Sequence, residues 1–181
     1  MASAPGPPIS TSQRQEASTT NIGPRAAEFV ERRLDLGATD RGRASARGPM
    51  LVVDASCLCE VLIGGPGADA IGARLVADRD HAAPHIVDVE VFGVIRREHL
   101  QGRLDRTEAA QAIEDLEAWP GERFGHRLLL ARAWELRDTM RGWDAMYVAL
   151  AEVMDAVLLT TDRRLAAAVG PTCRIEALDE P

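Results

Sequence analysis

The sequence predicts an α/β fold in which helices cover a central parallel sheet. Two short apolar runs of the buried-strand type, "LVV" at 51–53 and "AVLLT" at 156–160, each lead into an acidic residue and a helix-forming segment. Further strand-like and helix-like segments alternate between these two runs. Strands that alternate with helices indicate crossover connections, which join parallel strands and place helices on the faces of the sheet.

The first half of the folded region reads as two strands and three helices. Gly64 and Gly65 end the first helix, and Pro84 disfavours helix in the residue before it, so its neighbourhood should be extended. The third helix has apolar residues at i, i+4, i+7 and i+8, as an amphipathic helix does. The expected elements are a strand at 51–54, helices at 56–63 and 68–79, an extended piece at 81–85 and a helix at 86–102.

The second half continues the alternation. Thr107 is a good N-cap for the helix that follows it, and Pro120 with Gly121 closes that helix. The expected elements are helices at 108–119, 127–140 and 143–154, a short strand at 122–126, a strand at 156–160, a short helix at 163–169 and a last strand at 174–178. Such sheets carry their sites outside the carboxyl ends of the strands.

The chain divides into two parts at about Met50. Residues 1–49 are rich in Pro, Ser, Thr, Gly and Arg, and only 6 of these 49 residues are Leu, Ile, Val or Phe. That share lies below the roughly 20% under which a segment struggles to offset its chain entropy. We therefore expect 1–49 to be a mostly disordered extension or a mis-assigned start, and 50–181 to be one globular domain.

Charge and composition exclude several classes of function. Residues 50–181 carry 14 Arg and 23 acids, a net charge of −9, so non-specific nucleic-acid binding through the overall field is not expected. The chain has no lysine, which excludes a Walker A loop and receiver-type phosphoacceptor sites. Its three cysteines form no paired framework, and no apolar run approaches 18 residues. We expect a cytoplasmic protein with no membrane segment and no signal peptide.

Four acidic residues occupy positions that favour a shared site. Asp54 and Asp162 each end a buried strand, and they meet at one edge of the sheet if their strands are neighbours. Asp144 begins a helix in "WDAMYVALAE", and Glu90 lies inside an otherwise apolar helix. Each has an ordinary alternative: Asp144 and Asp162 as helix caps, Glu90 as a solvated side chain. Asp54 resists such an explanation most, because a carboxylate directly after "LVV" is costly to desolvate.

Taken together, the four acids point to metal-dependent chemistry. Carboxylates that share a cleft raise one another's pKa unless a cation compensates. Oxygen ligands without a His or Cys pattern favour Mg²⁺, or alternatively Mn²⁺, over Zn²⁺. Such ions suit phosphodiester hydrolysis, because they activate water and stabilise the attacking and leaving oxygens. They would also let an acidic domain bind a phosphate.

Four segments, in this order and at these separations, resemble the PIN domain of VapC-type toxins from toxin–antitoxin modules: "VVDASCLCEVL", "PHIVDVEVFGVIRR", "WDAMYVALAE" and "LLTTDRRL". The resemblance spans 50–181. It implies a three-layer α/β/α sandwich with a central parallel sheet, and an Mg²⁺-dependent ribonuclease. It also implies an RNA substrate, a cognate antitoxin protein that neutralises the enzyme, and a homodimer.

The resemblance also assigns roles to individual residues. The acidic quartet of the family falls on Asp54, Glu90, Asp144 and Asp162, with Asp54 and Asp144 as the principal metal ligands. Ser56 and Thr160 match hydroxyl residues beside the first and last acids, where they would orient carboxylates or water. The 49-residue extension departs from the usual pattern, in which the first Asp lies close to the initiator.

Candidates for holding the RNA are less specific. Arg97 lies two helical turns after Glu90, on the same side of the helix, and Arg163 and Arg164 start a helix, where the dipole disfavours cations. Each of these three has the ordinary alternative of a surface cation. Trp143 stands beside Asp144, where a base would be able to stack, although a core or interface role is the simpler interpretation.

Two other functions remain open at this point. The first is a catalytically weak PIN-like binding module, against which the four intact acids argue. The second is a metal-dependent hydrolase of small phosphoesters, which would act on a phosphomonoester without cleaving RNA.

Overall fold

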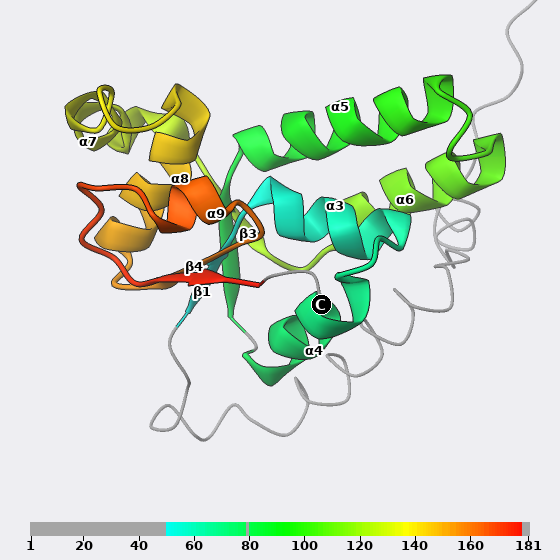
Figure 1. Cartoon of the computed structure of the whole chain (residues 1–181), viewed down its shortest axis with the longest axis horizontal. Coiled ribbons are helices and arrows are strands. Elements are labelled where there is room, and N and C mark those ends of the chain that lie inside the picture. Colours follow the sequence, from blue (N-terminus) through cyan, green and yellow to red (C-terminus); the bar gives the residue numbers. More distant parts are fainter. Residues whose placement is uncertain (1–49, 79, 179–181) are drawn as a thin grey trace, which may run out of the picture.

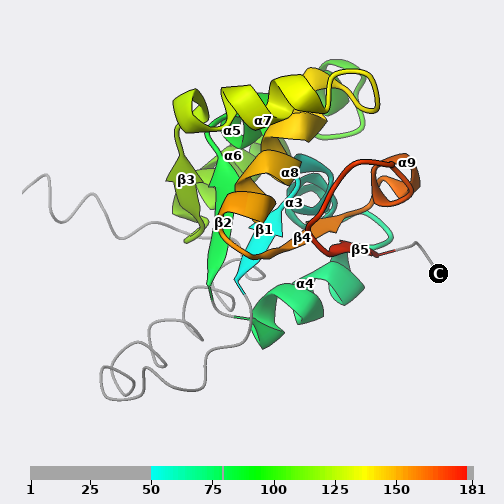
Figure 2. The ribbon, with the colours of Figure 1, turned by 90° about the vertical axis from the view of Figure 1, so that its left-hand side faces the viewer.

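The computed structural model describes residues 50–78 and 80–178. The expectation for 1–49 lies outside the described residues. Five parallel strands form one sheet in the order β3-β2-β1-β4-β5, as Figures 1 and 2 show. The strands are β1 (Leu51–Val53), β2 (His81–Pro84), β3 (Glu122–Phe124), β4 (Val157–Thr160) and β5 (Ile175–Ala177). The predicted α/β/α fold with a parallel sheet is confirmed.

The pairing of β1 with β4 positions the site. β1 is the central strand, and its residues are fully buried. It pairs with β4 in the register Val53↔Leu159, so the two strands end side by side. Asp54, which follows β1, and Thr160, the last residue of β4, are therefore neighbours at the carboxyl edge of the sheet.

Helices cover both faces of the sheet. On one side α3, α4, α5 and α6 pack against one another, and on the other α8 lies against β1, β2 and β4 with α7 beside it (Figure 1). The helices are α3 (Ala55–Ile63), α4 (Ala68–Ala77), α5 (Ile86–Leu100), α6 (Arg106–Ala118), α7 (Leu130–Glu135), α8 (Gly142–Val153) and α9 (Arg163–Ala166), with a 3₁₀ turn η1 (His126–Leu128). None of the described helices has the length and apolar character that a membrane span requires.

Several element ends differ from those predicted by a few residues, and two helices differ for a reason that the structure shows. The helix expected to be capped by Thr107 is capped by Asp105, whose side chain accepts from Glu108 N at 2.8 Å while Glu108 Oε2 accepts from Asp105 N at 2.8 Å. This reciprocal capping box satisfies two backbone donors, which a single threonine does not. The continuous helix expected over 127–140 is instead η1, the short α7 and a run of turns, in which Thr139 Oγ1 donates to Leu136 O.

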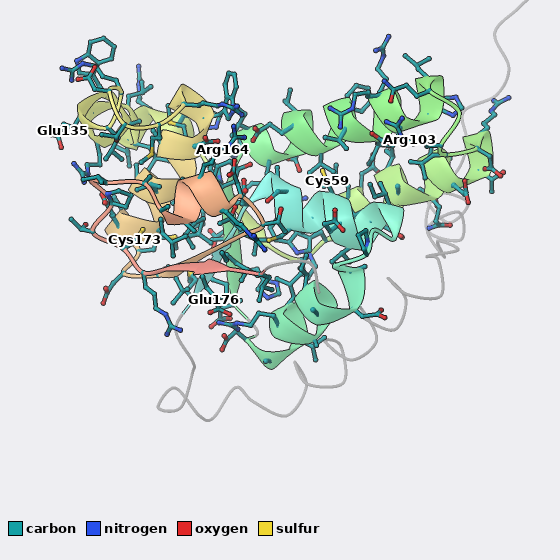
Figure 3. The ribbon with its side chains drawn as sticks, in the orientation of Figure 1. Cys59, Arg103, Glu135, Arg164, Cys173 and Glu176 are labelled. Atoms are coloured by element: carbon teal, nitrogen blue, oxygen red, sulfur yellow. The ribbon has the colours of Figure 1, made fainter. Side chains whose placement is uncertain are left out.

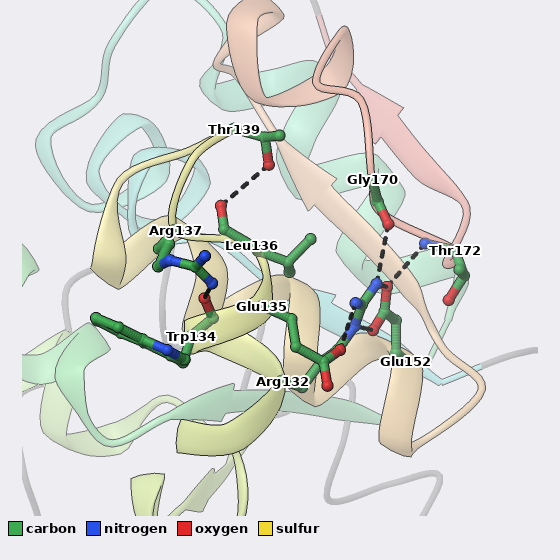
Figure 4. A network of polar contacts seen from close by, with 9 residues as sticks. All are labelled: Arg132, Trp134, Glu135, Leu136, Arg137, Thr139, Glu152, Gly170 and Thr172. Atoms are coloured by element: carbon green, nitrogen blue, oxygen red, sulfur yellow. Dashed lines mark hydrogen bonds and ion pairs between the residues drawn. The ribbon is translucent and has the colours of Figure 1, made fainter.

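A charged network fastens α7 and α8 to the segment before β5 (Figure 4). Arg132 Nε donates to Glu152 Oε2 at 2.6 Å, and its Nη2 donates to Gly170 O at 2.9 Å. Glu152 Oε1 also accepts from Thr172 N at 2.7 Å. The hydrogen bond from Arg132 lowers the pKa of Glu152. This single carboxylate thus joins two helices and a loop.

We expect Glu152→Gln to lower the free energy of unfolding by about 1–3 kcal/mol near neutral pH, the usual worth of a hydrogen bond to a charged group. The folded pKa lies below the ordinary value of 4.5, so this stabilisation is complete above that value and is lost as the pH falls through the folded pKa. The difference between wild type and variant should therefore shrink in acid. Urea unfolding at about pH 7 and about pH 4 measures it.

Glu135→Gln is the matched control. Glu135 contacts the same guanidinium at 2.8 Å, but its side chain is 64% exposed, against 11% for Glu152. Exposed ion pairs contribute little, so its loss should cost less than about 1 kcal/mol. Equal losses for the two variants would contradict the role given to Glu152.

We also expect a chain that begins at Met50 to fold by itself. The described strands and helices pack into one buried core that starts at Leu51. Residues 50–181 should therefore melt in one cooperative transition with the midpoint of the full chain, followed by circular dichroism. A large drop in the midpoint would assign stabilising contacts to residues 1–49 and contradict the predicted boundary.

Candidate active site

Asp54 is a buried carboxylate at the end of the central strand. Its backbone N–H donates to Leu159 O at 2.9 Å, which extends the ladder between β1 and β4 by one residue. It is also the N-cap residue of α3, yet its side chain makes no capping bond to that helix. Its side chain therefore does not have the capping role that is usual for an aspartate at this position. The residue is also only 8% exposed.

Two hydroxyls hold this carboxylate in place. Ser56 Oγ and Thr160 Oγ1 each donate to Asp54 Oδ2 at 2.7 Å. The same hydroxyls accept from the backbone of the segment after β4: Ser56 Oγ from Thr161 N at 3.1 Å, and Thr160 Oγ1 from Asp162 N at 3.0 Å. Ser56 was expected beside Asp54 and Thr160 beside Asp162. The structure places both hydroxyls on Asp54, with Thr160 also accepting from Asp162 N, and so links the ends of β1 and β4.

Glu90 is held by a residue that the sequence analysis missed. It projects from α5, is half-buried, and accepts a hydrogen bond from Tyr147 Oη at 2.7 Å. Tyr147 lies on α8 and is fully buried, so this bond joins the two helical layers. The interpretation of Glu90 as a solvated side chain is therefore wrong. The available signal was that the only tyrosine of the chain stands one turn after Asp144.

Asp144 and Asp162 are placed by the starts of two helices. Asp144 lies half-buried in the first turn of α8 and makes no side-chain cap, since the N-cap residue is Arg141. Asp162 does cap its helix, because its Oδ1 accepts from Arg164 N at 2.8 Å. A capping role and membership of the acidic quartet thus coincide at Asp162.

The acids influence one another's ionisation. Burial raises the pKa of Asp54, the bonds from Thr160 and Ser56 offset part of this, and the charge of Asp162 adds to it. Burial also raises the pKa of Glu90, against the bond from Tyr147, and the charges of Asp54 and Asp144 raise it further. These carboxylates are close enough to repel, although they come from four separate segments.

Asp144 and Asp162 respond in opposite directions. Burial and the charge of Asp54 raise the pKa of Asp144, while Arg141 and Arg164 pull it down in part. At Asp162 burial acts upward, but the hydrogen bonds and the positive charge of Arg164 outweigh it, so its pKa is lowered. A divalent cation would relieve the repulsion that raises the pKa values of Asp54, Glu90 and Asp144.

The donor set fits a hard divalent cation in its chemistry. All four residues offer carboxylate oxygens, the ligands that Mg²⁺ and Mn²⁺ prefer. Within residues 50–78 and 80–178, no three His, Cys, Asp or Glu side chains are gathered tightly enough to enclose an ion as they stand. As these side chains stand, an ion would be held by one or two of the carboxylates, with waters completing its coordination, as is usual for Mg²⁺.

The cysteine beside the acids offers no nucleophile. Cys59 is buried on α3, and burial together with the charges of Asp54 and Glu90 raises its pKa to about 12. The thiolate is the reactive form of cysteine, so this thiol is inert near neutral pH. The chemistry of the site consequently depends on oxygen groups.

The arginines predicted to bind substrate lie on two elements. Arg97 is exposed on α5, and its Nε donates to Glu98 at 3.3 Å. Arg163 is exposed at the start of α9, next to Asp162. His126 was not among the residues predicted from the sequence. Its Nε2 accepts from Ile86 N at 3.0 Å, at the start of the helix that carries Glu90.

Comparison with known sequences shows the family of this chain. The family model described as the PIN domain matches residues 51–170. Ribonuclease VapC3 of Mycobacterium tuberculosis (strain CDC 1551 / Oshkosh) is 43% identical over 129 residues, covering 70% of this chain and 93% of the relative. Ribonuclease VapC1 of the same strain is 39% identical over 127 residues, covering 69% and 95%.

Solved structures show the same fold. PAE2754 from Pyrobaculum aerophilum superimposes with a TM-score of 0.53 at 25% identity, over 72% of this chain and 83% of that one. VapBC2 from Rickettsia felis, bound to a DNA fragment from its promoter, gives 0.53 at 14% identity over 72% and 99%. The resemblance found in the four sequence segments is thereby confirmed. This chain belongs to the PIN-domain family, in the group of the VapC ribonucleases.

Proposed function

We propose that this protein is the toxin of a toxin–antitoxin pair, and that it is a metal-dependent endoribonuclease that hydrolyses RNA phosphodiester bonds at the acidic site. The observation that carries the proposal is the buried carboxylate of Asp54, fixed by Ser56 and Thr160 and placed within electrostatic reach of three further acids. The relatives that share this domain are named ribonucleases.

We assign the roles of the residues from their match to the acidic quartet of the family. Asp54 and Asp144 are the principal metal ligands, with Glu90 and Asp162 completing the set. A cation bound there supplies a water of lowered pKa and neutralises charge on the phosphate. Ser56 and Thr160 fix the orientation of Asp54, and Tyr147 fixes that of Glu90, so that few side-chain motions remain to be frozen when substrate binds.

The cofactor and partners are part of the same proposal. Oxygen ligands alone favour Mg²⁺, with Mn²⁺ as the second choice. The protein partner is a cognate antitoxin, and the substrate is RNA. We place the activity in the cytoplasm, where RNA is available and where unpaired cysteines such as Cys57 and Cys59 stay reduced.

Asp54→Asn should abolish cleavage while keeping the fold. The amide preserves the shape of the side chain but removes the charge that binds the cation. Activity should fall to about 1% or less, because even the outer partners of metal ligands are worth 10–100-fold. The measurement is cleavage of a pool of single-stranded and structured RNA by the full chain, without antitoxin, in Mg²⁺ and in chelator.

Asp138→Asn is the matched control, since Asp138 is an exposed acid paired with Arg137 on the α7 side of the molecule. It should cleave like the wild type. Undiminished cleavage by Asp54→Asn, or cleavage that persists in chelator, would contradict the proposal. Hydrolysis of a small phosphomonoester without cleavage of RNA would favour the small-phosphoester alternative.

Metal binding should also raise the free energy of unfolding. The raised pKa values of Asp54, Glu90 and Asp144 mean that the folded state binds more protons than the unfolded state, so the metal-free protein loses stability as the pH rises through these values. Mg²⁺ at about 100 times its dissociation constant should add about 2.7 kcal/mol, and more of this effect should appear at higher pH.

The corresponding measurement is the thermal midpoint with Mg²⁺ and with chelator, at several pH values. Asp54→Asn should lose most of the increase, and Asp138→Asn should keep it. An identical increase in Asp54→Asn would place the bound ion elsewhere.

A further inference from the structure

Two arginines and a tryptophan lie at the starts of the two helices that carry Asp144 and Asp162. Arg141 is the N-cap residue of α8, Trp143 directly precedes Asp144 on that helix, and Arg164 comes from α9. Both helix starts adjoin the acidic site. Tyr147, one turn after Asp144 on α8, donates to Glu90. Arg164 contacts Asp162 at 3.5 Å, and the N–H of Asp162 donates to Thr160, whose hydroxyl contacts Asp54. Both guanidinium groups lower the pKa of Asp144, so both lie within electrostatic reach of it.

Most side-chain N–H donors of Arg141 and Arg164 have no partner within the described part of the chain. Arg141 is exposed and forms no ion pair with any residue of the described part of the chain. Arg164 has a side chain that is 79% exposed, with one long contact from its Nε to Asp162 Oδ1 at 3.5 Å (Figure 3). A guanidinium carries five N–H donors, so most of those on both side chains face water.

Trp143 differs from the other two tryptophans. Trp119 is buried, with the guanidinium of Arg123 at 4.7 Å from its ring and His81 stacked on it. Trp134 is 69% exposed, but the guanidinium of Arg137 lies over its ring at 5.0 Å. Trp143 is 49% exposed, and among the described residues its ring has neither an aromatic nor a cationic partner.

Charge indicates what such a surface would attract. Residues 50–181 carry 14 Arg and 23 acids, so an approaching polyanion meets repulsion over most of the domain. A pair of arginines beside the acidic site is a local exception. Guanidinium groups that bind phosphate and an open indole face that accepts a base are the two elements of a surface for single-stranded nucleic acid.

Resting on the proposed function, we propose that Arg141, Trp143 and Arg164 form an entry strip for single-stranded RNA beside the acidic site. The two guanidinium groups bind backbone phosphates near the bond to be cleaved, and one unpaired base stacks on Trp143. Duplex RNA is disfavoured on this strip, because its bases are already stacked and paired.

The test uses the full chain carrying Asp54→Asn, so that bound RNA is not cleaved. The probe is a fluorescent single-stranded oligoribonucleotide of mixed sequence, titrated in Mg²⁺ at several salt concentrations. Arg141→Gln with Arg164→Gln should weaken binding and reduce the slope of log affinity against log salt by about 1.4, at about 0.7 for each lost phosphate contact on a single strand.

The aromatic contact has a different signature. Trp143→Ala should weaken binding by about 10-fold while leaving the salt slope unchanged, because stacking releases no counterions. The matched controls are Trp134→Ala and Arg137→Gln, a second exposed tryptophan and arginine on the α7 side. Both should leave affinity and slope at the parent values.

Two outcomes are kept apart by this design. Unchanged binding in the Arg141/Arg164 and Trp143 variants would overturn the entry strip, whatever the enzyme does. That result would also leave an acidic protein segment as the occupant of these arginines. Cleavage by the Asp54→Asn parent would instead overturn the proposed function, and the binding data would still decide the strip. In the active background, Trp143→Ala should raise KM more than it lowers kcat.

Discussion

The buried carboxylate of Asp54 is the constraint on which the site depends. Burial opposes its ionisation, and the hydroxyls of Ser56 and Thr160 offset part of that cost by donating to one of its oxygens. Thr160 reaches Asp54 only because β1 and β4 pair in parallel with Val53 opposite Leu159. A slip of one residue in this register would turn Thr160 to the other face of the sheet.

The same constraint extends to both helical layers. α5 carries Glu90 and α8 carries Tyr147, and the bond between these two side chains joins the layers beside Asp54. Asp54 and Glu90 are thus each held by neutral hydroxyls and not by a cation. Arginines offset the repulsion only in part, at Asp144 and Asp162, so the pKa values of Asp54, Glu90 and Asp144 stay raised, which is the condition that favours binding of a divalent cation.

Arginine has two separate uses in this acidic domain. Arg132 has a structural role: through Glu152 and Gly170 it joins α7, α8 and the segment before β5. Arg141 and Arg164 stand at the edge of the acidic site and remain exposed. A polyanionic substrate of a domain with this net charge needs such local cations, because the long-range field works against its approach.

The residue pattern alone was enough to predict the strands, the parallel sheet and four candidate acids for a site. Strands buried on both sides read as short apolar runs, and an acid after such a run is conspicuous because desolvation is costly. Asp54 and Asp162 were expected at one edge only if their strands were neighbours, and the pairing of β1 with β4 meets that condition. Boundaries were less secure: the capping box of Asp105 and the break after Glu135 depend on local bonds that periodicity does not register.

The groups that hold the acids could not be predicted from the sequence, because they come from distant parts of the chain. Tyr147 contacts Glu90 across 57 positions of the chain, and Thr160 contacts Asp54 across 106. Such contacts leave no periodic trace in the sequence, because the partners are brought together by the packing of different elements. The four carboxylates were recognised as candidates from the sequence. Their partners, their burial and their mutual repulsion depend on how the chain folds.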